Sequence, residues 1–376
     1  MASSFRSNLQ GAGLETANSS GDSSDVTILI AGDWRHTIYE SACADALRRL
    51  GVIVVPFKWS SFFDSLLGRA ERKYNISVLC IRQMNDALIR YAEAVRPDVV
   101  LIWRGVNILP ETIEKLKRCT GGPVVSFNND DPFSPQYVES RSLHLRRLWK
   151  LFVRTIPLYD CNYVYRSSNI PDYDNAGSRR SRVLRSYFVP SIHNPVKLTD
   201  AERGQYGCDV VFIGHCEQYR YDCLEYLAES EYKLRVYGPL STWMHFVTPQ
   251  SHFRPNPEIT GETYSKALCA ARLCLCFFSR LNRDAYTRRV FEITACGGVL
   301  LSERTPEMLT LFAEGSEALY FSSPEELKMV VASAFASPKK LKEIAEAGRL
   351  RCIRDGHSVD DRMKAWLADI GDIRRS

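Results

Sequence analysis

Residues 209–220 read DVVFIGHCEQYR, and this stretch decides the class of fold. A short apolar run, residues 210–213, ends in Gly214, and residues 219–230 then follow with the apolar spacing of a helix. Strands that are apolar along their whole length are typical of parallel sheets that helices cover on both faces. The stretch therefore predicts one strand-turn-helix unit of a parallel α/β domain.

The same alternation continues on the C-terminal side of this stretch. Apolar runs predict further strands at residues 233–238, 273–279, 299–302 and 318–321. Helices are expected at residues 262–271, 288–296, 305–313 and 324–336. Residues 338–370 have a helical pattern, with a break at Gly356, but no strand of their own. This tail must therefore pack on elements that are already built.

A second series of units precedes the stretch. Strands are expected at residues 26–31, 52–56, 98–103 and 123–127, with a further candidate at 161–165. Helices are expected at residues 39–50, 79–95, 110–118 and 141–154. Residues 167–185 are polar and basic and are expected to form a loop, and residues 187–196 are expected to cross into the second domain.

The whole pattern predicts an α/β protein with two Rossmann-like, doubly wound domains. Ligands of such sheets bind at the carboxyl ends of the strands, so a cleft between the domains is expected. We expect a disordered tail over residues 1–24, an N-terminal domain over 25–195 and a C-terminal domain over 196–350. Residues 351–376 are expected to form a C-terminal helix that packs back across the domains.

The composition argues against several classes of protein. The 376 residues are enough for two domains, and the net charge of +5 is too small to indicate a nucleic-acid partner. The 12 cysteines are scattered in apolar runs without a C-x-x-C pair, which disfavours a zinc ribbon and indicates a reducing compartment. No apolar stretch approaches the ~20 residues that span a bilayer, and the N-terminus has no hydrophobic signal region. We therefore expect a cytoplasmic protein.

The loop after the strand at residues 209–214 is a candidate phosphate site. Gly214 allows a ligand to approach the backbone closely, and the start of the next helix offers free N–H groups and the positive end of its dipole. Arg220, in the first turn of that helix, can add a fork of donors to a phosphate oxygen. The alternative interpretation is an ordinary turn with an arginine on the surface.

A second candidate site is the sequence DAYTRRVFE at residues 284–292. Arg288 and Arg289 lie at the start of the predicted helix, where the dipole normally disfavours basic residues, so they indicate an anionic ligand. The carboxylate of Glu292 can accept hydrogen bonds from both hydroxyls of a ribose. The alternative is an i,i+3 ion pair between Arg289 and Glu292, which is worth a few tenths of a kcal/mol.

Residues 289–298, RVFEITACGG, resemble the R-x-F-E-x-x-A-C-G-x motif of the spore-maturation-protein-like glycosyltransferases. These are relatives of the large retaining family marked by E-x7-E. Other stretches resemble motifs of the same family in the same order, and the resemblance covers roughly residues 98–366. They are DDP at 130–132, DVVFIG at 209–214, RVYG at 235–238, LFAEG at 311–315, PEEL at 324–327 and H-x4-R at 357–362.

The resemblance implies a GT-B fold, with a nucleoside-diphosphate sugar on the C-terminal domain and the acceptor on the N-terminal one. Glu292 would hold the ribose, and Arg289 and Arg220 would hold the diphosphate. The implied donor-binding residues are Gly214, Arg220, Tyr237, Gly238, Arg288, Arg289 and Glu292. UDP is the expected nucleotide. The departing diphosphate would be stabilised by arginine and helix N-termini, without a metal ion or another cofactor.

Three aspartates are candidates for catalysis. The first acid of E-x7-E would fall on Asp284, a shorter carboxylate than the family's glutamate. Asp130 and Asp131 follow the strand at residues 123–127, and such a pair can hold a metal ion, although it lies in the domain opposite the nucleotide site. The preferred interpretation is a polar wall of the cleft that contacts sugar or accepts the acceptor's proton, and the alternative is a turn and cap. Residues after other N-terminal strands are candidates for acceptor binding: Gly32, Asp33, Trp34, Arg35 and Arg104.

The function expected from these features is sugar transfer from a nucleoside-diphosphate sugar to a small molecule, a glycan or a lipid-linked acceptor. The alternatives are a nucleotide-sugar epimerase-like enzyme and a non-catalytic nucleotide-sugar-binding subunit on the same fold. The basic helix at residues 141–154 adds an alternative partner, an anionic membrane surface, although a solvated face over a packed stripe is favoured. The sequence does not specify the donor base or sugar, the acceptor, the stereochemistry or the oligomeric state.

Overall fold

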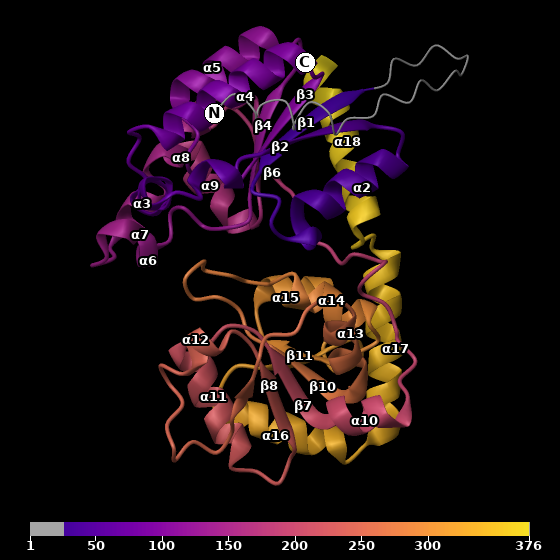
Figure 1. The fold of residues 1–376 in the computed structure, drawn as a ribbon. Coiled ribbons are helices and arrows are strands. Elements are labelled where there is room, and N and C mark those ends of the chain that lie inside the picture. Colours follow the sequence, from indigo (N-terminus) through magenta and orange to yellow (C-terminus); the bar gives the residue numbers. More distant parts are fainter. Residues whose placement is uncertain (1–25, 376) are drawn as a thin grey trace.

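The computed structural model describes residues 26–375, which form two parallel α/β domains (Figure 1). Each domain is a parallel sheet between layers of helices, as its apolar strands predict. The expected fold of two Rossmann-like domains is therefore confirmed. The segment predicted to be a disordered tail, residues 1–24, lies outside the described residues. From Val26 to Arg375, the chain contains no helix of the length and apolarity that crossing a bilayer would require.

The N-terminal sheet has six parallel strands in the order β2-β1-β3-β4-β5-β6. They are β1 Thr27–Gly32, β2 Ile53–Lys58, β3 Val99–Trp103, β4 Val124–Asn128, β5 Cys161–Val164 and β6 Ser181–Val183. The sequence predicts the first five strands but not β6, which lies in the segment expected to be a loop. An edge strand pairs on one side only, and β6 stays half-buried, so it carries no continuous apolar run.

The helices of this domain position the loops of the cleft. They are η1 Thr37–Ser41, α2 Ala42–Arg49, η2 Ser60–Phe63, α3 Leu66–Tyr74, α4 Cys80–Val95, α5 Pro110–Cys119, α6 Pro135–Val138, α7 Leu143–Leu148, α8 Lys150–Thr155, η3 Ile156–Leu158, η4 Ser167–Asn169 and α9 Ile170–Asn175. The single helix expected at residues 141–154 is instead α7 and α8, separated by a turn at Trp149. The buried indole of Trp149 packs edge-on against Tyr137 and Phe152, with ring centroids 5.8 and 5.7 Å apart. Burying this large ring takes precedence over continuing the helix.

The C-terminal sheet also has six parallel strands, in the order β12-β11-β10-β7-β8-β9. They are β7 Cys208–Ile213, β8 Leu234–Tyr237, β9 Pro255–Asn256, β10 Ala271–Cys276, β11 Leu300–Glu303 and β12 Leu319–Phe321. Its helices are α10 Asp200–Tyr206, α11 Gln218–Ala228, α12 Leu240–Trp243, α13 Gly261–Ala270, α14 Arg289–Ala295, α15 Pro306–Leu311, α16 Pro324–Phe335 and α17 Pro338–Arg354. The sequence analysis did not predict the two-residue β9, whose Pro-Asn pair carries no strand pattern, or the short helices α10 and α12.

The chain passes between the domains twice, and the two crossings pair with each other. The N–H of Phe188 donates to the carbonyl of His357 at 3.0 Å, and the N–H of Val359 donates to the carbonyl of Phe188 at 2.9 Å. Gly356, with φ +64°, ends α17 on the C-terminal domain, and α18 Val359–Arg375 then packs against α2 of the N-terminal domain (Figure 1). The last helix therefore ties the two domains together on one side of the cleft.

Candidate functional site

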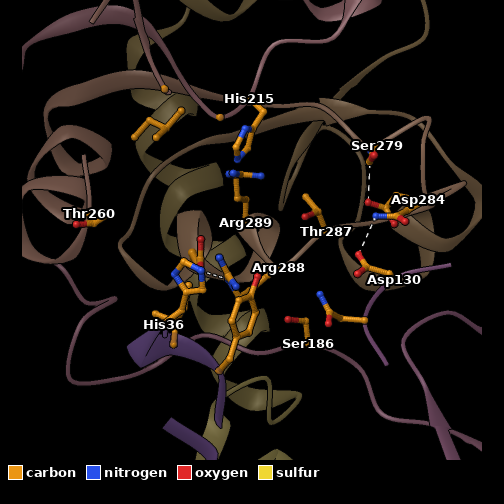
Figure 2. A pocket seen from close by; sticks show the side chains of 18 of the residues that line it. His36, Asp130, Ser186, His215, Thr260, Ser279, Asp284, Thr287, Arg288 and Arg289 are labelled. Atoms are coloured by element: carbon orange, nitrogen blue, oxygen red, sulfur yellow. Dashed lines mark hydrogen bonds and ion pairs between the residues drawn. The ribbon is translucent and has the colours of Figure 1, made fainter. Parts of the chain in front are cut away.

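A cavity of about 1070 Å³ lies between the two sheets, at the carboxyl ends of their strands (Figure 2). The N-terminal domain contributes the loop after β1, the end of β3 and the loop after β4. The C-terminal domain contributes the loops after β7, β8 and β10 and the start of α14. This is the edge where ligands of parallel α/β sheets bind.

The glycine loop after β7 is locked against the end of β8. The N–H of Gly214 donates to the carbonyl of Tyr237 at 2.8 Å, and the indole N–H of Trp243 donates to the carbonyl of Gly214 at 3.0 Å. A Cβ atom on Gly238 would lie 2.1 Å from the carbonyl oxygen of Gly214, so no side chain fits there. This packing holds the loop over residues 214–217 at the wall of the cavity.

Two arginines of the C-terminal domain, Arg289 and Arg220, lie at this loop beside its own His215. Arg289, at the start of α14, is half-buried and has no hydrogen-bond or ion-pair partner among residues 26–375. It lies close to His215 (Figure 2), and burial together with the charges of Arg289 and Arg220 lowers the pKa of that imidazole. Arg220 is 6% exposed, pairs with Glu217 at 2.7 Å and donates to the carbonyl of His215 at 3.0 Å. An unneutralised Arg289 beside a glycine loop at a helix start suits an anion.

Glu292 lies one turn further along α14 and is 2% exposed. Its carboxylate pairs with Arg288 and accepts a hydrogen bond from the Tyr264 hydroxyl at 2.7 Å. Burial by itself would raise its pKa, but the charges of Arg288 and His193 and the Tyr264 hydrogen bond lower it to about 2. Glu292 is therefore ionised at neutral pH. The alternative ion pair with Arg289 is wrong, because Arg288 is the partner.

His193 is a buried neighbour of Glu292 that the sequence analysis missed. Its Nε2 lies 3.6 Å from the nearer carboxylate oxygen of Glu292. The N–H of Val189 donates to Nδ1 at 2.9 Å, so the ring proton sits on Nε2 and faces the carboxylate. Burial lowers the pKa of His193, and Glu292 opposes the change. Its sequence surroundings indicate only a crossing between domains, so no local signal connects it to α14.

Asp284 lines the cavity but is already paired. The buried guanidinium of Arg166, from the end of β5, donates to Asp284 and to the carbonyl of Asn129 at 3.1 Å. Burial raises the pKa of the Asp284 carboxyl, and Arg166 opposes the rise. The ion pair joins the two domains across the cavity, a contact that the sequence does not predict. It leaves Asp284 neutralised by an arginine rather than free toward a ligand.

The two N-terminal acids separate in the structure. Asp130 lines the cavity, pairs with Arg104 and accepts from the side-chain amide of Asn282 at 3.3 Å. Asp131 is fully buried outside the cavity, where it pairs with Arg283 of the opposite domain. Across residues 26–375, no group of three or more His, Cys, Asp or Glu side chains is arranged to hold a metal ion. The structure therefore brings Asp130 to the site, while Asp131 fixes a loop.

Of the five acceptor candidates, only Arg35 lines the central cavity. Gly32 packs against the buried carboxylate of Glu40, which accepts from the N–H groups of Asp33 at 2.9 Å and Trp34 at 3.3 Å. These three residues therefore build the loop after β1 rather than the cavity wall. Arg104, which pairs with Asp130, and Tyr237, which is buried in the core, also lie outside the lining. The loop instead presents residues that the sequence did not single out: His36, Thr37, Ile38 and Tyr39.

The loop between β10 and α14 closes one side of the cavity against the N-terminal domain. Tyr286 stacks on Tyr165 with ring centroids 4.7 Å apart and planes at 3°, and its hydroxyl donates to the carbonyl of Tyr165 at 2.9 Å. The guanidinium of Arg288 lies over the ring of Tyr39, 4.9 Å from its centroid. Arg288, which pairs with Glu292, therefore also contacts the N-terminal domain.

Comparisons with known proteins agree with this geometry. Residues 220–368 match a family model described as glycosyl transferase-like. The solved structures of Anabaena HepE with UDP and glucose, sucrose-phosphate synthase from Thermosynechococcus elongatus and a glycosyltransferase from Rickettsia africae have TM-scores of 0.64, 0.68 and 0.66. In the same order, their sequences are 10, 11 and 12% identical to this chain. The matched regions span 92, 92 and 93% of this chain and 100, 99 and 98% of the respective solved chains. The search of curated proteins gave no significant match. The likeness confirms the expected GT-B architecture.

Proposed function

We propose that the chain is a glycosyltransferase that moves a sugar from UDP-sugar to an acceptor hydroxyl or amine. The observation that carries the proposal is the unpaired Arg289 beside the Gly214 loop, one turn before the ionised Glu292, in a cavity between two Rossmann-like sheets. This arrangement offers a cation for a diphosphate and a carboxylate for a ribose in the lining of one cavity. The family match and the relative solved with UDP support it.

In this proposal, each side chain has a separate role. Arg289 and the start of α14 stabilise the charge that develops on the departing diphosphate, so the protein itself supplies the positive charge. Glu292 accepts from the ribose hydroxyls and is kept ionised by Arg288. Asp130 faces the acceptor from the N-terminal domain, and Asp284, fixed by Arg166, shapes the donor-sugar end of the cavity. Arg220 orients the loop through the carbonyl of His215.

The proposal is tested by Arg289→Ala, with Arg203→Ala on α10 as a matched control that removes an exposed arginine from the same domain. Binding of UDP is measured by titration calorimetry, and transfer from UDP-sugars is measured across an acceptor panel. We expect the Arg289 variant to lose transfer and most of its UDP affinity while its circular dichroism spectrum is unchanged. Full activity in this variant would refute the site assignment.

A non-catalytic nucleotide-sugar-binding protein is the second candidate function. One observation favours it: Asp284, the residue at the position of the first acid of the motif, is neutralised by the buried Arg166. Tight UDP-sugar binding with no turnover across the acceptor panel would support this candidate. Conversion of the donor sugar without any acceptor would instead identify an epimerase-like enzyme, so incubation with donor alone, together with the acceptor panel, separates the three cases.

A further inference from the structure

Large apolar side chains are exposed together at one corner of the N-terminal domain. α3, α6 and α7 gather there, and α7 packs against both other helices (Figure 1). We call the following eight residues the apolar rim: Leu66, Leu67, Tyr74, Ile76, Val78, Leu79, Val138 and Leu143. Leu66 is 80% exposed and Val138 is 59% exposed, although such side chains are normally buried. Large apolar side chains exposed on helices that pack against one another indicate a surface that binds a partner.

The rim is held in a fixed shape by a buried acid. The carboxylate of Glu71, on the inner side of α3, accepts hydrogen bonds from the N–H groups of Leu79 at 2.8 Å, Cys80 at 3.1 Å and Ile81 at 3.0 Å. The side-chain amide of Asn75 donates to the carbonyls of residues 147 and 148 at the end of α7. The exposed side chains therefore project from a built surface rather than from a loose loop.

The same elements carry an excess of positive charge. The exposed basic residues are Arg69 and Lys73 on α3 and Arg141, Arg146, Lys150 and Arg154 on and around α7 and α8. The exposed acids of these segments, residues 64–79 and 135–154, are only Asp64 and Glu139. On α3, Leu66, Arg69, Lys73 and Tyr74 share the outer side, so apolar and basic side chains alternate along it.

A cavity of about 480 Å³ opens between α3 and α7, beside the rim. Its lining contains one acid, Asp64, and the following basic residues: Arg35, Arg69, Arg72, Lys73, Arg104 and His144. Asp33 pairs with Arg72 and Arg35, and Asp130 pairs with Arg104, whereas the side chain of Arg69 has no ion-pair or hydrogen-bond partner in the described part of the chain. Arg35 lines both this basic cavity and the central cavity, so the two spaces are neighbours.

We propose that this corner docks on an anionic membrane surface, with the apolar rim inserted at the headgroup level and a lipid phosphate in the basic cavity. Charge complementarity selects this occupant, because apolar side chains flanked by arginine and lysine match a bilayer that carries negative phosphates. A second copy of the chain would bring the same positive charges face to face. Docking would place the mouth of the central cavity close to the bilayer, so that a lipid-linked acceptor in the membrane could enter the cavity. Only this last point rests on the proposed function.

The test is sedimentation of the full chain with vesicles of phosphatidylcholine alone and with phosphatidylglycerol added, at low and high salt. We expect binding only to the anionic vesicles, and weaker binding at high salt. Replacing Arg69 and Lys73 by glutamine lowers the partition coefficient about fivefold for each charge removed. The triple variant Leu66→Ser, Leu67→Ser, Leu143→Ser lowers it by more than about tenfold.

The matched control is Met329→Ser with Leu350→Ser, which removes side chains that are 65% and 59% exposed on helices of the other domain. It leaves vesicle binding unchanged, and unchanged melting curves show that all variants are folded. Equal binding to both kinds of vesicle, or full binding by the triple variant, overturns the proposal. So does a dimer in sedimentation velocity that the triple variant converts to a monomer, which identifies a self-association surface. The vesicle experiment uses no donor, so its outcome is independent of sugar transfer.

Discussion

Replacing Glu292 by glutamine changes the charge of the site while keeping its shape. The carboxylate is buried, and its surroundings lower its pKa from 4.5 to about 2. Since the folded state lowers this pKa, ionised Glu292 stabilises the protein above the pKa of the unfolded chain. That stabilisation is lost as the pH falls through the range from about 4.5 to about 2. Glutamine cannot ionise, so it resembles the protonated acid at every pH.

The size of the effect follows from these two pKa values. The gap between them corresponds to about 3 kcal/mol of folding free energy at neutral pH, at about 1.4 kcal/mol for each tenfold change in proton affinity. At pH 3 the carboxylate is still ionised in the folded state but protonated in the unfolded chain, and about half of this stabilisation remains. Glu292→Gln should therefore lower the free energy of unfolding by about 3 kcal/mol at pH 7 and by about half as much at pH 3.

The measurement is urea unfolding of both proteins at pH 7, 5 and 3, followed by far-ultraviolet circular dichroism. Other carboxylates titrate in both proteins, so their contributions cancel in the difference. Glu343→Gln, which changes an exposed glutamate of α17, is the control and should stay within a few tenths of a kcal/mol of the parent. A cost that does not change with pH, or a Glu292 variant as stable as the parent at pH 7, would refute the reasoning.

Three further predictions use other parts of the site. Arg289→Ala should weaken UDP binding about 10- to 100-fold in calorimetry and change the melting temperature of the free protein little, because the side chain of this arginine has no hydrogen-bond or ion-pair partner among the described residues. Gly238→Ala should destabilise the C-terminal domain by several kcal/mol in urea unfolding, because the new Cβ would lie 2.1 Å from the carbonyl oxygen of Gly214. The control is Gly204→Ala in helix α10, where the new Cβ meets nothing within 4 Å and should stabilise the domain by up to about 1 kcal/mol. Arg166→Leu should lower the free energy of unfolding by about 3 kcal/mol, because it leaves the buried carboxylate of Asp284 without a partner. Adding Asp284→Leu should recover most of that loss. A double variant as unstable as the single one would show that the ion pair is not the cause.

The order of strands and helices could be predicted from the sequence because it depends on local periodicity. Continuous apolar runs mark the buried strands β1, β3, β4, β7 and β10 wherever the chain places them, since both faces of a parallel sheet are covered. The exceptions are informative. β6 pairs on one side only and carries no such run, and the turn at Trp149 arises from burying an indole against rings from other helices. Tertiary packing overrides helical spacing at that point.

The sequence predicted those residues of the candidate site that lie in loops directly after a strand or at the start of the following helix. Gly214, Arg289 and Glu292 lie where the carboxyl ends of the strands place them, because the position of a loop after a strand is a property of the β-α unit. The partners of these residues come from distant parts of the chain. His193 reaches Glu292 from the crossing segment, and Arg166 reaches Asp284 from the other domain. No spacing in the sequence encodes either contact.

The sequence by itself therefore determined the two α/β domains and the glycine loop, arginine and glutamate at the edge of the C-terminal sheet. Only the tertiary structure decided which charges at that edge remain available. It neutralised Asp284 with Arg166 and buried Asp131 with Arg283. Glu292, although paired with Arg288, still lines the cavity, and Arg289 is left without an ion-pair partner among the described residues. The reason is physical: periodic burial is a local property of the chain, whereas the pairing of charges depends on how two separately folded sheets meet.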